Sequence, residues 1–174
     1  MPEKASFKSV TALVIDDNEH MLKIASTFLR AFGFGRILTA SSALEGFEMF
    51  RDTPVDLIIV DYHMPELNGV DLIEKVRTGR DSTNTFVPII MLTAYAELAF
   101  ICKARDIGVT EFMCKPLSPK GLYEKIVTVI EHPRQFVKVD GYFGPDRRRR
   151  IDKSFNGVER RLNQSPAQTV RIHA

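Results

Sequence analysis

Short apolar runs recur along the first three quarters of the chain. In the clearest, residues 55–61, four of seven residues are Val or Ile, and no polar residue interrupts Leu57 to Val60. Such a run predicts a strand that is buried on both faces of a parallel sheet. Four other runs predict further strands of this kind: residues 11–15, 36–40, 88–93 and 110–115.

Between these runs, apolar residues recur at a spacing of three or four, which predicts amphipathic helices. Helices are expected from Asn18 to Gly33, from Ser42 to Pro54, from Gly69 to Gly79, over 97–107, and from Ser118 to near Glu131. Strands that alternate with helices are joined by right-handed crossovers. The expected fold is therefore α/β, with a doubly wound five-stranded parallel sheet.

The chain divides into a body and a basic tail. Its 174 residues leave room for one domain with a core and an appendage. We expect an N-terminal extension over 1–8, a domain over 9–131, and a C-terminal tail over 132–174, because the apolar periodicity stops before Pro133. Residues 1–131 carry 14 Lys or Arg against 18 Asp or Glu, whereas residues 132–174 carry 10 against 4.

Composition narrows the class of protein. No apolar run approaches the roughly 20 residues that span a bilayer, and the N-terminus lacks a secretory apolar segment, so a cytoplasmic protein without membrane contact is expected. The two cysteines, Cys102 and Cys114, lie in apolar surroundings. We expect both to be reduced core residues that form neither a disulfide nor a metal site.

Polar side chains follow the predicted strands at their carboxyl ends. Asp16 and Asp17 follow the first, Asp61 the third, Thr93 the fourth and Lys115 the fifth. Because such strand ends meet at one edge of the sheet, these groups should converge there. Three crowded carboxylates repel one another unless a cation binds, and oxygen ligands favour Mg²⁺ over Zn²⁺. Lys115 and Thr93 could then donate to an anion beside the metal.

These motifs resemble the receiver domain of two-component response regulators, of the stand-alone chemotaxis-regulator type. The similarity covers residues 9–131 and rests on four elements in order. They are Asp16-Asp17, the D-x-x-M-P-x-x-x-G element from Asp61 to Gly69, Thr93-Ala94 and Lys115-Pro116. The resemblance implies a flavodoxin-like fold and a protein that is switched by phosphorylation.

The resemblance also assigns roles in phosphoryl transfer. Asp61 is implied to be the phosphoacceptor, taking its phosphoryl group from a histidine kinase or a histidine phosphotransfer protein. Asp17, Asp61 and the backbone carbonyl of His63 are the implied Mg²⁺ ligands, with Asp16 acting directly or through water. Lys115 would pair with the phosphoryl oxygens.

Four further residues are implied to serve the switch. Thr93 resembles the hydroxyl that moves toward the phosphoryl group, and Phe112 the aromatic that turns inward as Thr93 leaves space. Ala94 is small, as access to the phosphoryl group requires, and Pro116 is where a cis peptide is expected.

The predicted function is a phosphorylation-dependent switch that regulates an output protein by contact. It is not expected to be an enzyme beyond Mg²⁺-dependent self-phosphorylation and autodephosphorylation. Two alternatives remain, a DNA-binding transcription regulator that uses the basic tail and a phosphorelay intermediate or phosphate sink. A metal-dependent phosphatase is less favoured, because Asp16-Asp17-Asn18 stands where that class has D-x-D.

The tail leaves several interpretations open. It could be a disordered basic segment. Its aromatic run around Phe136 and Phe143, and the helical spacing of apolar residues over 151–162, instead favour a docking segment. We rank docking on its own or a second receiver's acidic surface first, binding of an output partner second, and nucleic acid binding through Arg147–Arg150 last. The last helices or the tail could also mediate self-association.

Overall fold

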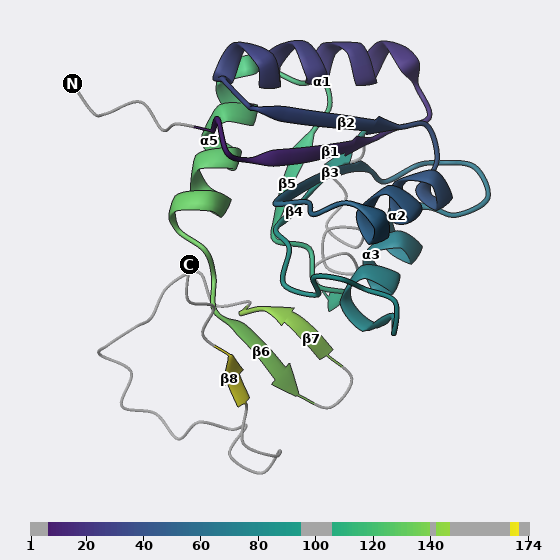
Figure 1. Cartoon of the computed structure of the whole chain (residues 1–174), viewed down its shortest axis with the longest axis vertical. Helices are drawn as coiled ribbons and strands as arrows, with labels where there is room; N and C mark the ends of the chain where they lie inside the picture. The colour runs from purple at the N-terminus through teal and green to yellow at the C-terminus, as the bar shows by residue number, and fades with distance from the viewer. Residues whose placement is uncertain (1–6, 95–105, 140–141, 147–167, 171–174) are drawn as a thin grey trace.

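A computed structural model describes residues 7–94, 106–139, 142–146 and 168–170 of the chain (Figure 1). Five parallel strands form the main sheet in the order β2-β1-β3-β4-β5. They are β1 (Thr11–Ile15), β2 (Arg36–Ala40), β3 (Leu57–Asp61), β4 (Ile89–Thr93) and β5 (Glu111–Cys114). The doubly wound parallel sheet expected from the sequence is confirmed.

In the described part of the chain, four helices pack on this sheet, and each begins at a side chain that caps its first amides. They are α1 (Glu19–Phe32), α2 (Ala43–Asp52), α3 (Gly69–Thr78) and α5 (Pro119–Glu131). The capping residues are Asn18, Ser42, Asn68 and Ser118. The helix expected over 97–107 lies outside the described residues except for its last two. No helix in the described ranges is long and apolar enough to cross a membrane.

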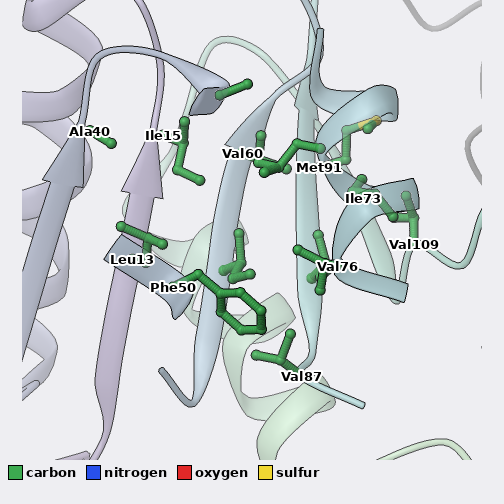
Figure 2. Close-up of a cluster of buried hydrophobic side chains, with 14 of the residues drawn as sticks. Leu13, Ile15, Ala40, Phe50, Val60, Ile73, Val76, Val87, Met91 and Val109 are labelled. Carbon is green, nitrogen blue, oxygen red and sulfur yellow. The ribbon is translucent and has the colours of Figure 1, made fainter. Parts of the chain in front are cut away.

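The central strands are apolar throughout because both of their faces are covered. Successive side chains of a strand point to opposite faces, so an unbroken apolar run feeds two cores. One core, between the sheet and helices α2 and α3, takes Leu13, Ile15, Ile58, Val60, Ile89 and Met91 (Figure 2). The other, beneath α1 and α5, takes the alternate residues Ala12, Val14, Leu57, Ile59, Ile90 and Leu92.

Cys114 corrects one expectation from the sequence. It is exposed, because it is the last residue of β5 and β5 is the edge strand of the sheet. It is a free cysteine among the described residues. Cys102 lies outside the described residues.

The tail forms a second, smaller sheet in the order β7-β6-β8, drawn below the main sheet in Figure 1. Its strands are β6 (Phe136–Val139), β7 (Tyr142–Pro145) and β8 (Gln168–Val170). Phe136 and Phe143 pack edge-on against Phe86, with ring centroids 5.2 and 5.4 Å away. Residues 136–139 and 142–145 are therefore strands that pack near Phe86, and the helical spacing noted over 151–162 lies outside the described residues.

A buried arginine on α3 holds the loops that lead into β4 and β5. Arg77 is 3% exposed, and its Nη1 donates to the carbonyls of Thr85 and Val87, each at 2.8 Å. Its Nε donates to the carbonyl of Gly108 at 3.0 Å, and its guanidinium lies 5.0 Å from the centre of the Phe136 ring. Burial lowers the pKa of Arg77 to about 9, so the group stays charged at neutral pH.

Replacing this arginine tests how far it supports the fold. Arg77→Met should lower the free energy of unfolding by about 2–4 kcal/mol, because three carbonyls, two of them buried, lose a charged donor. Arg80→Met, on an exposed arginine three residues away, is the control and should change little. Urea denaturation of both variants measures the difference. Equal losses would show that the arginine network contributes nothing specific.

Candidate functional site

The sheet register brings the polar strand ends together at one edge. Ile15 pairs with Val60, Asp61 with Leu92, and Thr93 with Cys114. The strands β1, β3, β4 and β5 therefore end side by side, and the residues that terminate or follow them share one edge. The sequence predicted this convergence, and the geometry of the site follows from it.

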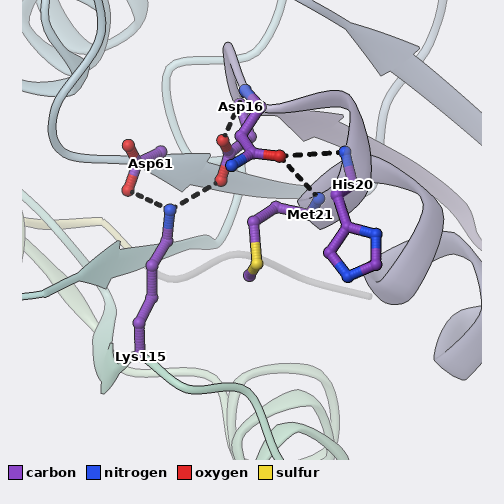
Figure 3. Close-up of polar contacts among 6 residues, drawn as sticks. Asp16, His20, Met21, Asp61 and Lys115 are labelled. Carbon is purple, nitrogen blue, oxygen red and sulfur yellow. Dashed lines mark hydrogen bonds and ion pairs between the residues drawn. The ribbon is translucent and has the colours of Figure 1, made fainter.

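Lys115 bridges two buried carboxylates at this edge. Its Nζ lies 2.8 Å from Asp16 Oδ2 and 2.9 Å from Asp61 Oδ1 (Figure 3). Asp16 is 1% exposed and Asp61 is 5% exposed, so bulk water hardly screens the negative charge of either carboxylate. One ammonium, which follows β5, thus offsets two acids that come from the ends of β1 and β3.

The loop after β1 fixes the orientation of Asp16. Its Oδ1 accepts a hydrogen bond from the backbone amide of Asn18 at 2.9 Å, which leaves Oδ2 directed at Lys115. The Asn18 side chain in turn accepts from the amides of His20 and Met21 and caps α1 (Figure 3). The start of α1 therefore holds the acidic loop in place.

Asp17 completes a group of three acids. One carboxylate oxygen from each of Asp16, Asp17 and Asp61 lies within 4.8 Å of the others, and Asp17 is exposed. Burial raises the pKa of Asp61; Lys115 opposes this, while Asp16 and Asp17 add to it by charge repulsion. The cluster contains only carboxylate oxygens, which are the donors that hard divalent ions prefer. These residues therefore fit a hard cation, and Asp17 is the member of the group that is exposed to solvent.

The charge of Lys115 is secured by its partners. Burial acts to lower the pKa of Lys115, but the hydrogen bonds to Asp16 and Asp61 outweigh it and the net shift is upward. The ammonium is therefore a fixed positive charge beside Asp61. A charge in this position can contact an anion that binds there.

The loop after β3 closes back on Asp61. The amide of Gly69 donates to the carbonyl of Tyr62 at 3.0 Å, and a Cβ at Gly69 would collide with the carbonyl oxygen of Asp61. The ninth and last position of the D-x-x-M-P-x-x-x-G element therefore has to be glycine for steric reasons. Asn68 and Asp71 form a capping box that begins α3 at this point. The sequence alone indicated no role for Asn68, although Asn followed three residues later by an acid is a capping signal.

The other predicted residues lie around this cluster. Thr93 is buried, and its carbonyl accepts from the amide of Lys115 at 2.8 Å. Ala94 is exposed beside it. Phe112 is half-buried on β5, where it pairs with Met91 and packs against the core beneath α2 and α3.

Two backbone expectations have different outcomes. The peptide between Lys115 and Pro116 is cis, as the resemblance implied. His63 is exposed, and its ring packs edge-on against Tyr62 at 4.9 Å. The predicted contribution of its carbonyl to metal binding stays a prediction.

Known proteins resemble this chain over the main sheet and its helices. The family model of the response regulator receiver domain matches residues 12–127. Chemotaxis protein CheY1 of Helicobacter pylori is 35% identical over 119 residues, covering 68% of this chain and 94% of that protein. Chemotaxis protein CheY-3 of Vibrio cholerae is 30% identical over 124 residues, covering 71% and 94%. Among solved structures, Vibrio cholerae CheY4 matches with a TM-score of 0.65 at 26% identity, covering 70% of this chain and 98% of that chain.

Substituting Gly69 tests the steric link between the loop and Asp61. Gly69→Ala should cost about 1–3 kcal/mol of stability, because the new methyl group pushes on the carbonyl of Asp61. It should also shift the amide NMR signals of Asp61 and Lys115. The control is Gly33→Ala: a Cβ there meets no atom within 4 Å and suffers only from the positive φ of 90°. Unchanged site signals in Gly69→Ala would refute the link.

Proposed function

This chain belongs to the response regulator receiver family, and from that premise we propose that Asp61 accepts a phosphoryl group from a phosphohistidine on a partner protein. The observation that carries the proposal is the bridge from Lys115 to Asp61, beside an acidic cluster at the sheet edge. A histidine kinase or a histidine phosphotransfer protein would present the donor.

The proposed transfer is a displacement at phosphorus. A carboxylate oxygen of Asp61 attacks the phosphorus atom, and an O–P bond forms as the N–P bond of the phosphohistidine breaks. The electron pair of the broken bond stays on the imidazole nitrogen, which then takes up a proton. Such a reaction needs positioning and charge neutralisation more than covalent assistance. Lys115, within 2.9 Å of Asp61, is placed to pair with the incoming phosphoryl oxygens.

We assign the acidic cluster to Mg²⁺. Asp17 and Asp61 would be its ligands, Asp16 would contribute directly or through water, and the family pattern adds the carbonyl of His63. A bound Mg²⁺ supplies the positive charge that crowded carboxylates and phosphoryl oxygens need. The fit rests on an all-oxygen donor set whose one exposed member, Asp17, leaves room for water and phosphate ligands.

The proposed output is a change in protein contacts. Phosphorylation adds up to two negative charges at Asp61, and the buried Thr93 and half-buried Phe112 are the proposed residues that respond. The relatives CheY1 and CheY-3 carry the name chemotaxis protein, and the match spans 94% of each. A signalling receiver that acts by binding another protein is therefore favoured over a DNA-binding regulator or an enzyme with its own substrate.

Mass measurement tests the acceptor. After incubation with phosphoramidate and Mg²⁺, the wild type should gain the mass of one phosphoryl group and Asp61→Asn should gain none. The matched control is Asp56→Asn, an exposed acid that precedes the same strand and accepts from the amide of Thr11. It should be modified like the wild type. Full modification of Asp61→Asn would refute the assignment.

Metal titration tests the role of Asp17. Mg²⁺ should raise the melting temperature of the wild type, because a ligand that binds only the folded state stabilises it. Asp17→Asn should weaken Mg²⁺ binding by about tenfold or more, since a ligand is lost. Glu19→Gln, on an exposed acid at the start of α1 outside the cluster, is the control. Equal Mg²⁺ affinity in Asp17→Asn and wild type would show that Asp17 is not a ligand.

A further inference from the structure

The C-terminal hairpin, defined here as Arg134–Val139 with Tyr142–Asp146, docks on the receiver at the sheet edge opposite Asp61. Its base is closed by the amide of Asp146, which donates to the carbonyl of Gln135 at 2.7 Å. Residues 128–174 lie beyond the part that matches the receiver family, so the hairpin is an addition to the matched domain. The hairpin contacts that domain on both sides of the sheet.

On the α3 side, the backbone of the hairpin packs directly against the loop that precedes β5. A Cβ at Gly144 would lie 2.7 Å from the Cα of Gly108, and a Cβ at Gly108 would lie 2.9 Å from the carbonyl oxygen of Phe143. The two backbones therefore touch directly. Phe136 covers the guanidinium of Arg77, which itself holds the carbonyl of Gly108. A shift of this loop would disturb the hairpin.

On the α5 side, the hairpin is attached to the first residue of β5. Glu111 is 4% exposed, and its carboxylate accepts from Arg134 at 2.5 Å and from Lys125 of α5 at 2.7 Å. Breaking a buried, charge-assisted pair of this kind is costly, because it leaves a desolvated charge. The hairpin thus contacts the loop before β5 on the α3 side and the first residue of β5 on the α5 side.

β5 is the strand most open to such control. It is four residues long, lies at the edge of the sheet and, among the described residues, pairs in that sheet with β4. Glu111 begins it, and Lys115, the cation of the acidic site, follows its last residue. One short strand therefore joins the hairpin contact at its amino end to the Asp61 contact at its carboxyl end.

We propose that the C-terminal hairpin is an intramolecular restraint on β5 that opposes phosphorylation of Asp61 and is loosened by it. The inference rests on the proposed function. A phosphoryl group on Asp61 changes the charge that Lys115 faces, and with it the position of β5 that is most stable. The hairpin contacts Gly108 and Glu111 with β5 in the position described above, so a displacement of β5 weakens these contacts. Linkage then requires that phosphorylation weaken the hairpin contacts by the same factor.

Hydrogen exchange on the full wild-type chain tests whether phosphorylation loosens the hairpin. Beryllofluoride with Mg²⁺ serves as the mimic of the acyl phosphate. Its addition should speed exchange of the β6 and β7 amides by about fivefold or more, the lower range of typical coupling between sites. Strands β1 and β3 should show no such increase. Unchanged exchange in β6 and β7, with beryllofluoride bound at Asp61, would overturn the inference and leave the proposed function intact.

A matched pair of variants tests whether the hairpin opposes phosphorylation of Asp61. Arg134→Met and Lys125→Met each remove one cation from Glu111, but only Arg134 belongs to the hairpin. Arg134→Met should tighten beryllofluoride binding by about fivefold or more, whereas Lys125→Met should not. Equal affinities in the two variants would overturn the restraint. If a variant fails to fold, the exchange experiment on the wild type still decides.

The two proposals fail in distinguishable ways. If beryllofluoride with Mg²⁺ leaves the NMR signals of Asp61 and Lys115 unchanged in the wild type, the phosphoacceptor proposal fails and the restraint fails with it. If those signals shift while hairpin exchange stays constant, only the restraint fails.

Discussion

The ammonium of Lys115 between the carboxylates of Asp16 and Asp61 is the interaction on which the site depends. Three acids gathered at one edge of a sheet would repel one another, and burial makes that repulsion stronger by removing the screening of water. Lys115 offsets part of this charge by pairing with Asp16 and Asp61, while Asp17 stays exposed to solvent. The repulsion among the carboxylates is therefore partly compensated, and the remaining negative charge suits a divalent cation. The ammonium of Lys115 suits an anion.

The sheet supplies the precision that this arrangement needs. Strands that are apolar on both faces are fixed by two cores, so their ends cannot slide relative to one another without exposing buried side chains. The loops that follow are fixed in turn, by the Asn18 cap after β1 and by the close approach of Gly69 to Asp61 after β3. At the opposite edge, the hairpin holds β5 through Glu111, so both ends of that strand are restrained.

The sequence predicted those features that depend on local pattern. Apolar runs that end in Asp61 or Lys115 indicate buried strands. Because these strands alternate with helices, few topologies are possible, and the strand ends are expected at one edge of the sheet. Contacts between distant segments were not predictable in this way. The pairing of Glu111 with Arg134 depends on the path of the tail, and burial of Arg77 depends on the Phe136 ring that covers it. The sequence does carry a hairpin signal in the tail, since Asp140-Gly141 separates two apolar stretches.

The central claim is that Asp17 and Asp61 share a divalent ion beside the oxygen that is phosphorylated. A crystal structure of the full chain with Mn²⁺ and beryllofluoride tests it most directly, because anomalous scattering locates the metal independently. We predict a metal peak in contact with carboxylate oxygens of Asp17 and Asp61, and beryllofluoride on Asp61 within hydrogen-bond distance of Lys115. A metal peak away from these carboxylates, or beryllofluoride bound to another residue, would contradict the claim.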